Sequence, residues 1–310
     1  MNSDTALTWT IAAILGAFVV GNLVATQTRR YQDKHVLNFW QKVGLPMGTE
    51  RINASVTRRL RRSSTASALG GVAGYLVSLG ILLLSPTPAN TIAYTWVVAL
   101  PAILIGTTIF DVALAMRDTL FAQPDGTTRM ARATAVFLRD YITPWKLYAP
   151  PVLLGLATSM VAISATLDGT DASALATSLA STSLPALVTA VLVLMGCAVA
   201  VRKILGQPQP VSGVLELAWD DALRADTVRK AGLLATSMSW LALAAAASGL
   251  VVAVDSSLSS TMWFTNVQIL LSWGFIAITM VYTYGSSFNW FRRRLWPELL
   301  PSNAGTAGNA

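Results

Sequence analysis

Seven apolar stretches, each about as long as a membrane-crossing helix, most constrain what this chain can fold into. They cover 6–25, 65–85, 92–114, 147–167, 184–201, 232–254 and 263–284. A helix of about 20 apolar residues crosses the roughly 30 Å hydrocarbon core of a bilayer. Because 54% of the residues are hydrophobic and only 12% are charged, the chain lacks the polar surface of a soluble domain. The sequence therefore predicts an all-α, polytopic membrane helix bundle with seven transmembrane helices.

The distribution of basic residues predicts the orientation of these helices. Nine of the 22 Lys and Arg residues lie in 26–64, five in 115–146, five in 202–231 and three in 285–310. The connections expected on the opposite side, 86–91, 168–183 and 255–262, contain none. Basic loops are retained in the cytoplasm. We therefore expect the N-terminus outside and the C-terminus in the cytoplasm of a bacterial-type cell membrane.

The expected organisation is one transmembrane domain over 1–284, with helical cytoplasmic loops at 26–64, 115–146 and 202–231. Segment 285–310 is expected to be a cytoplasmic tail with a disordered end, because its last residues are small and polar. The net charge of +7 follows from this topology, since the basic residues flank the spans. It does not indicate nucleic-acid binding, which we do not expect.

Enzyme and metal-site interpretations find little support in the residues. The chain has one histidine, His35, and one cysteine, Cys197, which are too few for a His/Cys metal site. It also lacks P-loop, HExxH and GxSxG motifs. We therefore expect no enzyme activity and no bound cofactor. His35 is interpreted as a solvated loop residue and Cys197 as a small apolar filler.

The first cytoplasmic loop contains a basic amphipathic segment directly before the second span. The basic side chains that gather on one side of this predicted helix are Arg51, Arg58, Arg61 and Arg62. A helix of this kind lies on anionic lipid headgroups, where each basic residue contributes about 1 kcal/mol of binding free energy. The alternative is a specific lipid or nucleotide site on the same segment.

The second span contains small residues at every fourth position, including Gly70 and Gly74 in a GxxxG pattern. Glycines at this spacing allow the backbone of another helix to approach closely. The pattern predicts a helix that packs against neighbouring helices in the bundle interior.

Asp111 is the sole acidic residue within a predicted span. An ionised carboxylate costs about 3 kcal/mol at the centre of a membrane helix, and less near an end. Asp111 lies about one turn from the cytoplasmic boundary and near a helix C-terminus, where a negative charge needs a partner. Two interpretations remain open: a hydrogen-bonded interfacial carboxylate, or a carboxylate that couples transport to protons or cations.

Residues 214–232 join an apolar stripe to paired charges, directly before the sixth span. The apolar face of this predicted helix holds Leu215, Trp219, Ala222 and Leu223. Asp220–Arg224 and Asp226–Lys230 are i,i+4 pairs with the acid first, the order that stabilises a helix. The segment is either an amphipathic extension of the sixth span or a helix that docks a cytoplasmic partner. Its candidate docking residues are Glu216, Trp219, Asp220, Asp221 and Arg224.

Within this stretch, residues 216–223 read Glu-Leu-Ala-Trp-Asp-Asp-Ala-Leu. They resemble the cytoplasmic coupling motif of ABC-importer membrane subunits, which reads Glu-Ala-Ala, two further residues, then Asp-Gly-Ala. Glu216, Ala218 and Asp221 match this pattern in position. Leu217 and Leu223 depart from it, and the glycine is replaced by Ala222. The resemblance implies that this short helix docks into a cleft of a separate ATPase subunit.

The sequence accordingly predicts a membrane subunit of an ABC-type transport complex for a small or lipophilic substrate. Its expected partners are the lipid bilayer, anionic headgroups, and a cytoplasmic ATPase or another membrane subunit, because the chain itself has no ATP-binding motif. One alternative is a non-transporting seven-span scaffold or sensor with partner-binding cytoplasmic loops. A second alternative is a secondary transporter that uses Asp111.

Overall fold

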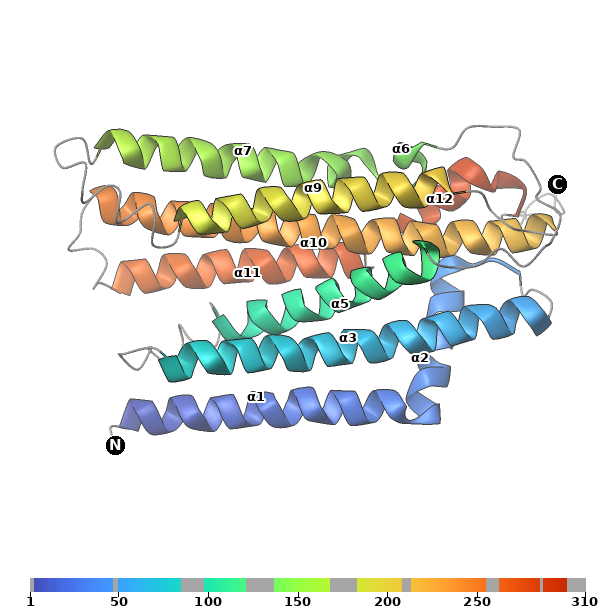
Figure 1. Ribbon diagram of the computed structural model, residues 1–310, viewed down its shortest axis with the longest axis horizontal. Helices are drawn as coiled ribbons and strands as arrows, with labels where there is room; N and C mark the ends of the chain where they lie inside the picture. The colour runs from blue at the N-terminus through green and yellow to red at the C-terminus, as the bar shows by residue number, and fades with distance from the viewer. Residues whose placement is uncertain are drawn as a thin grey trace, which may run out of the picture.

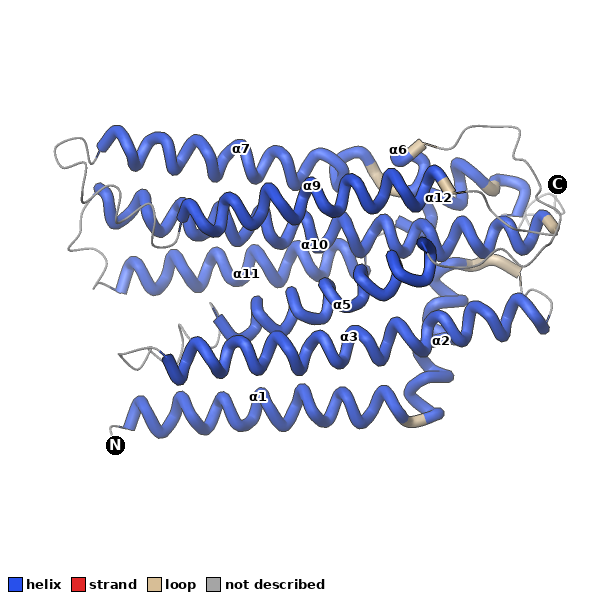
Figure 2. The backbone as a smooth tube through the Cα atoms, in the orientation of Figure 1, coloured by secondary structure: helices blue, strands red, loops and turns tan. Residues whose placement is uncertain are grey.

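The computed structural model describes residues 3–46, 50–84, 98–120, 137–167, 183–207, 213–254, 262–284 and 287–299. Within these ranges the chain is helical apart from short connections and contains no strand (Figures 1 and 2). The helices are α1 Ser3–Gln27, α2 Arg29–Val43, α3 Glu50–Leu84, α5 Leu100–Leu120, α6 Leu138–Tyr141, α7 Pro144–Leu167, α9 Leu184–Gly206, α10 Val214–Val254, α11 Met262–Tyr284, α12 Ser287–Leu295 and the 3₁₀ turn η4 Pro297–Leu299. The predicted all-α fold is confirmed.

Seven of these helices are long and apolar enough to cross a membrane, which confirms the predicted number of spans. Two of them extend well beyond a bilayer. At 1.5 Å per residue, the 41-residue α10 is about 60 Å long and the 35-residue α3 about 50 Å. The helices expected in the loops before the second and sixth spans are therefore the first parts of α3 and α10. Neither part contains Gly or Pro to end the helix.

The transmembrane helices form two groups (Figure 1). One group contains α1, α3 and α5, with α3 packed most extensively on α5. The other contains α7, α9, α10 and α11, with α10 packed most extensively on α7 and α9. Among the contacts between the groups, those of α10 with α5 are the most extensive. Polar contacts between α5 and α10 therefore join the two groups of helices.

The close packing of α3 on α5 depends on Gly70 and Gly74. A Cβ atom at Gly70 would collide with the backbone carbonyl oxygen of Gly106, and one at Gly74 with that of Ala102. Gly106 in turn faces the carbonyl of Gly70. The GxxxG pattern of the second span therefore lies against the third span, with the two backbones in direct contact.

One end of the bundle carries α2, α6 and α12 (Figure 1). Most of the described Lys and Arg residues also lie at this end, in α2, in α12 and at the starts of α3 and α10. We call it the basic end. α1 begins at the opposite end. The largest cluster of buried apolar residues is also at the basic end. It includes Phe288 and Phe291 of α12, so the first part of the expected tail is a packed helix. Residues 300–310, expected to be disordered, and 121–136 of the second loop lie outside the described residues.

Candidate functional site

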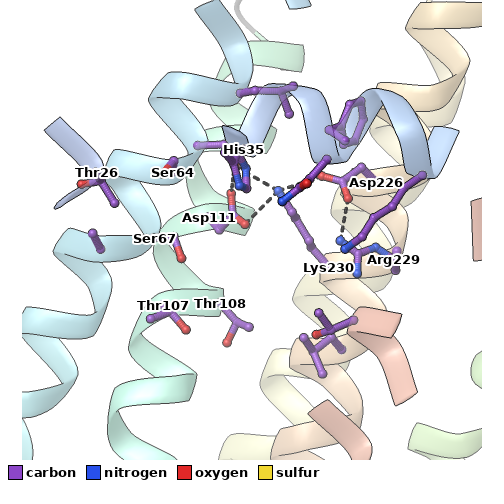
Figure 3. A pocket seen from close by; sticks show the side chains of 18 of the residues that line it. Thr26, His35, Ser64, Ser67, Thr107, Thr108, Asp111, Asp226, Arg229 and Lys230 are labelled. Atoms are coloured by element: carbon purple, nitrogen blue, oxygen red, sulfur yellow. Dashed lines mark hydrogen bonds and ion pairs between the residues drawn. The ribbon is translucent and has the colours of Figure 1, made fainter. Parts of the chain in front are cut away.

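A polar cavity of about 340 Å³ lies between the two helix groups near the basic end. Helices α1, α2, α3 and α5 line one side, and α10 and the junction of α11 with α12 line the other. The polar and charged lining residues are Asn22, Thr26, Tyr31, His35, Asn38, Lys42, Ser63, Ser64, Ser67, Thr107, Thr108, Asp111, Asp226, Arg229, Lys230 and Thr283. Figure 3 labels ten of them around the space between α3, α5 and α10. So many polar groups between membrane helices mark this cavity as the candidate site.

Lys230 occupies the centre of the charged residues in this cavity (Figure 3). Its Nζ lies 2.8 Å from Oδ2 of Asp111, 2.7 Å from Oδ2 of Asp226 and 3.0 Å from Oγ of Ser63. An ammonium group has three N–H donors, so these three acceptors satisfy it completely. Ser63 also donates a hydrogen bond to Oδ1 of Asp111. Lys230 on α10 thereby binds α5 directly and α3 through Ser63, across the junction of the two groups.

Arg229 completes the arrangement on the α10 side of the cavity. Its Nη2 lies 2.7 Å from Oδ1 of Asp226, and its Nη1 donates to the carbonyl oxygen of Tyr282 at 2.9 Å. Both oxygens of Asp226 therefore accept from a cation, one from Arg229 and one from Lys230. Charge-assisted hydrogen bonds of this kind are about twice as strong as neutral ones.

The short-range sequence pattern predicts the ion pairs within α10 but not the contacts of Asp111. The predicted i,i+4 pair between Asp226 and Lys230 is confirmed at 2.7 Å, and that between Asp220 and Arg224 at 2.9 Å. The partner of Asp111 was not identified from the sequence, because Ser63 and Lys230 come from α3 and α10, far away along the chain. The sequence does indicate that such a partner exists, because a carboxylate near a helix C-terminus requires a cation or a hydrogen-bond donor.

The prediction that His35 is solvated is confirmed, because its side chain is exposed, but the prediction that it lies in a loop is wrong. His35 lies in α2, and its ring is stacked on that of Tyr31 at a centroid distance of 6.4 Å. Burial, followed by the nearby Lys230 ammonium, lowers the pKa of the imidazole from its ordinary 6.5. His35 is therefore a neutral cavity residue at neutral pH that gains charge under acid conditions.

The position of α2 follows from its two ends. Thr28 caps the N-terminus by accepting from the amide of Tyr31 at 3.4 Å. Gly44 ends the helix in the left-handed conformation with φ 63°, which favours glycine. Arg292 of α12 then donates to the carbonyl oxygens of Val43 at 3.1 Å and Gly44 at 3.2 Å. These contacts hold α2 across the basic end, beside the cavity.

Arg224, a candidate docking residue, is buried within the chain. Its guanidinium donates to the carbonyl oxygens of Ile204 at 3.0 Å and Gln207 at 3.1 Å, at the C-terminal end of α9. It also binds Asp220 at 2.9 Å. A cation that bonds the last carbonyls of a helix satisfies acceptors that have no partner within that helix. Arg224 therefore caps α9.

Two further docking candidates are also buried. Asp221 is 0% exposed, and accepts hydrogen bonds from the hydroxyl of Tyr141 at 2.9 Å and the indole of Trp296 at 3.0 Å. We call these three residues the Asp221 clasp. Trp219 is 2% exposed and donates to the carbonyl oxygen of Pro46 at 3.2 Å. Glu216 and Asp220 are half-buried. The docking of a partner on this stretch stays a prediction.

The basic segment of α3 exposes Arg58, Arg61 and Arg62 at the basic end, as headgroup contacts require. Arg61 forms an ion pair with Asp33 of α2 at 3.0 Å. The side chain of Arg51 lies outside the described residues. Within the described part of the chain, no group of three or more His, Cys, Asp or Glu residues is placed to hold a metal ion.

Comparison with known protein families, curated proteins and solved structures finds no match to this chain. The function is therefore argued from the cavity and the helices that surround it.

Proposed function

We propose that this multi-pass membrane protein is a transporter that takes a small polar solute into the cavity between its two helix groups. The observation that carries the proposal is the contact between Lys230 and Asp111. This ion pair joins α10 to α5 at 2.8 Å, and both side chains line the cavity. A solute that binds there meets the same groups that hold the two helix groups together.

Asp111 is the coupling group in this mechanism. When its carboxylate takes up a proton, it loses its attraction for Lys230, and the ammonium is left with Asp226 on its own helix. The contact between α5 and α10 then weakens, and the two groups can separate around the cavity. A charged group between membrane helices is retained at a considerable free-energy penalty, which favours a functional role for it. This reading corresponds to a secondary transporter that uses Asp111.

The ABC-type alternative has less support. Trp219, Asp221 and Arg224 are each no more than 6% exposed, so a partner that docks on residues 216–223 has few of these side chains to contact. A lipophilic substrate also fits the cavity poorly, because most of its lining residues are polar or charged. A scaffold or sensor is the second candidate, since α2, α6 and α12 build a structured surface at the basic end.

The proposed separation of the two helix groups, which we call the gate, is tested by measuring the distance between the groups. Spin labels at Arg58→Cys on α3 and Lys203→Cys on α9, both exposed at the basic end, report this distance in a Cys197→Ala background. We expect Asp111→Asn to lengthen or broaden the distance distribution. The matched control is Asp33→Asn, which removes the exposed ion pair with Arg61 and leaves the cavity intact. An unchanged distribution in Asp111→Asn rules out this gate.

Transport itself is tested with proteoliposomes on a solid-supported membrane. Jumps in pH and in the concentration of small anions, amines and amino acids should produce transient currents with the wild-type protein and none with Asp111→Asn. A distance change without any solute-dependent current would instead favour the scaffold or sensor.

A further inference from the structure

Four hydroxyl side chains line the part of the cavity that lies between α3 and α5. They are Ser64 and Ser67 on α3, and Thr107 and Thr108 on α5 (Figure 3). We call these four residues the hydroxyl pocket. Helices α3 and α5 pack closely on each other, so one small molecule in the cavity can contact hydroxyl groups from both helices.

The two threonines of the hydroxyl pocket offer acceptors to a ligand. Thr107 and Thr108 donate their hydroxyl protons to the carbonyl oxygen of Leu104, at 2.7 and 2.9 Å. A hydroxyl group has one proton and two lone pairs. Each threonine has therefore used its donor within α5, and its lone pairs can still accept a hydrogen bond.

The two serines differ from the threonines in their hydrogen bonding. Neither Ser64 nor Ser67 forms a hydrogen bond through its hydroxyl to another residue that the structure describes. Ser64 is only 8% exposed, and buried hydroxyl groups almost always have a partner. A molecule in the cavity can supply this partner, and the serines offer it both a donor and an acceptor.

These properties select one kind of ligand group. A group that satisfies the pocket accepts from the serines and donates to the threonines. The oxygen of an ionised carboxylate can only accept, and an ammonium group can only donate, whereas a hydroxyl group does both. Adjacent hydroxyl groups on one carbon chain therefore complement the pocket best.

We propose that the hydroxyl pocket binds adjacent hydroxyl groups of a small polyhydroxylated solute. The same chemistry is present in a free polyol and in the sugar headgroup of a glycolipid. This inference rests on the proposed function for the role of the cavity in transport, but binding can be measured separately. It names the chemical class of the solute that the gate admits.

Binding is tested by saturation-transfer NMR on the purified protein in detergent, with erythritol and 1,4-butanediol as probes. Both have a four-carbon chain with two terminal hydroxyl groups, and erythritol carries two more on its middle carbons. Erythritol should therefore bind more tightly. Ser64→Ala should weaken erythritol binding by about fivefold, the effect of losing one neutral hydrogen bond. Ser159→Ala is the matched control, because Ser159 is exposed on α7, donates to Leu156 of its own helix and does not line the cavity.

Two further measurements separate recognition from a structural effect. Ser64→Ala removes a buried hydroxyl that has no partner among the described residues, so the unfolding temperature without ligand should not fall. Thr107→Val removes an acceptor and should reduce the preference for erythritol over 1,4-butanediol. Thr158→Val is its control, since Thr158 likewise donates to a carbonyl oxygen of its own helix but lies outside the cavity.

A variant of the gate distinguishes this proposal from the proposed function. Asp111→Asn removes the ion pair with Lys230 but none of the four hydroxyl groups, so erythritol should still bind to it. Erythritol binding without Asp111-dependent currents would refute the transport mechanism and leave the hydroxyl pocket standing.

The source of the hydroxyl groups is decided by native mass spectrometry with a monoglucosyl diacylglycerol added to the micelles. If the ligand is a free solute, erythritol binds and the glycolipid is not retained. If it is a headgroup, the glycolipid stays bound to the wild type and to Ser159→Ala and is lost from Ser64→Ala. The proposal is overturned if neither erythritol nor the glycolipid binds, or if erythritol and 1,4-butanediol bind with equal affinity.

Discussion

Asp221 and Asp226 lie on the same helix, little more than one turn apart, and their surroundings differ. Asp221 is 0% exposed and accepts from the side chains of Tyr141 and Trp296, which bring α6 and the segment after α12 onto α10. Asp226 is bound by Arg229 and Lys230, and lines a cavity of about 340 Å³. Both carboxylates are satisfied, but only Asp226 lies where a solute can reach its neighbours.

The difference shows that burial and hydrogen bonding do not by themselves identify a functional charge. The Asp221 clasp ties three segments together at a place without access, so removing it should cost stability. The charges around Lys230 join two helix groups beside an open space, so removing them should change function more than stability. Four predictions test this distinction, from the largest effect to the smallest.

Breaking the clasp should have the largest effect on stability. Asp221→Ala removes two hydrogen bonds to a carboxylate and leaves the Tyr141 hydroxyl and the Trp296 indole without that acceptor. Hydrogen bonds to charged groups contribute about 1.5–3 kcal/mol each, so we expect the free energy of unfolding to fall by about 4 kcal/mol. The measurement is equilibrium unfolding in mixed micelles, followed by tryptophan fluorescence.

The matched control for the clasp is Asp33→Ala, which removes an ion pair between exposed side chains and should change stability by less than about 1 kcal/mol. The distance between spin labels at Arg58→Cys and Lys203→Cys should be the same in the folded fraction of Asp221→Ala as in the wild type. A changed distance there would show that the clasp and the cavity are one unit.

Forcing α3 away from α5 should have the next largest effect and should reach the cavity. Gly74→Leu places a side chain against the carbonyl oxygen of Ala102, and overpacking of this kind destabilises by about 3 kcal/mol. Because α5 carries Asp111, the displacement should also weaken its ion pair with Lys230. Gly80→Leu is the control, since a Cβ atom at Gly80 meets nothing within 4 Å. Equal losses in the two variants would contradict the close packing at Gly74.

Removing Lys230 should destabilise less than breaking the clasp. Lys230→Met leaves Asp111 and Asp226 without their shared ammonium, and breaking a fully buried pair typically destabilises by 3–5 kcal/mol. Because these side chains line a cavity that water can enter, we expect about 2 kcal/mol in unfolding experiments. Asp226 keeps its ion pair with Arg229, so adding Asp111→Asn removes the carboxylate that has lost its cation and should restore about 1 kcal/mol. A double variant less stable than Lys230→Met would show that Asp111 has another stabilising partner.

The smallest effect should be the pH dependence contributed by His35. Burial and the Lys230 ammonium lower the pKa of this imidazole in the folded protein below its ordinary 6.5. Below about pH 6.5 the imidazole takes up a proton in the unfolded chain but resists it in the folded chain. The free energy of unfolding therefore decreases as the pH is lowered, until the pH passes the folded-state pKa. His35→Gln should lack this component.

The His35 prediction is checked by comparing the unfolding free energies of the wild type and His35→Gln at several values between about pH 7.5 and about pH 5. Asp111, Asp226, Lys230 and Lys42 face His35 and are present in both proteins, so the difference isolates the imidazole. A difference that does not change with pH would exclude His35 as a titrating group of the cavity.

The class of fold follows from the amino-acid sequence alone, because the length of an apolar stretch is a local property. About 20 apolar residues in succession must cross the bilayer wherever they occur in the chain, and all seven predicted spans correspond to helices. Local spacing likewise identified the ion pairs within α10, such as Asp226 with Lys230. The exposure of His35 also agrees with its polar, basic surroundings in the sequence, whereas its place in the helix α2 differs from the predicted loop.

The roles of the charged residues depend on how the helices pack. Lys230 and Ser63 are 167 residues apart, and they meet because α3, α5 and α10 converge beside the cavity. Asp221 and Asp226 have the same side chain on the same helix, so no local pattern separates a clasp from a cavity residue. The separation depends on which helices pack against each face of α10, and whether they leave space there. The space beside α10 depends on several helices at once, so it cannot be predicted from any single segment of the chain.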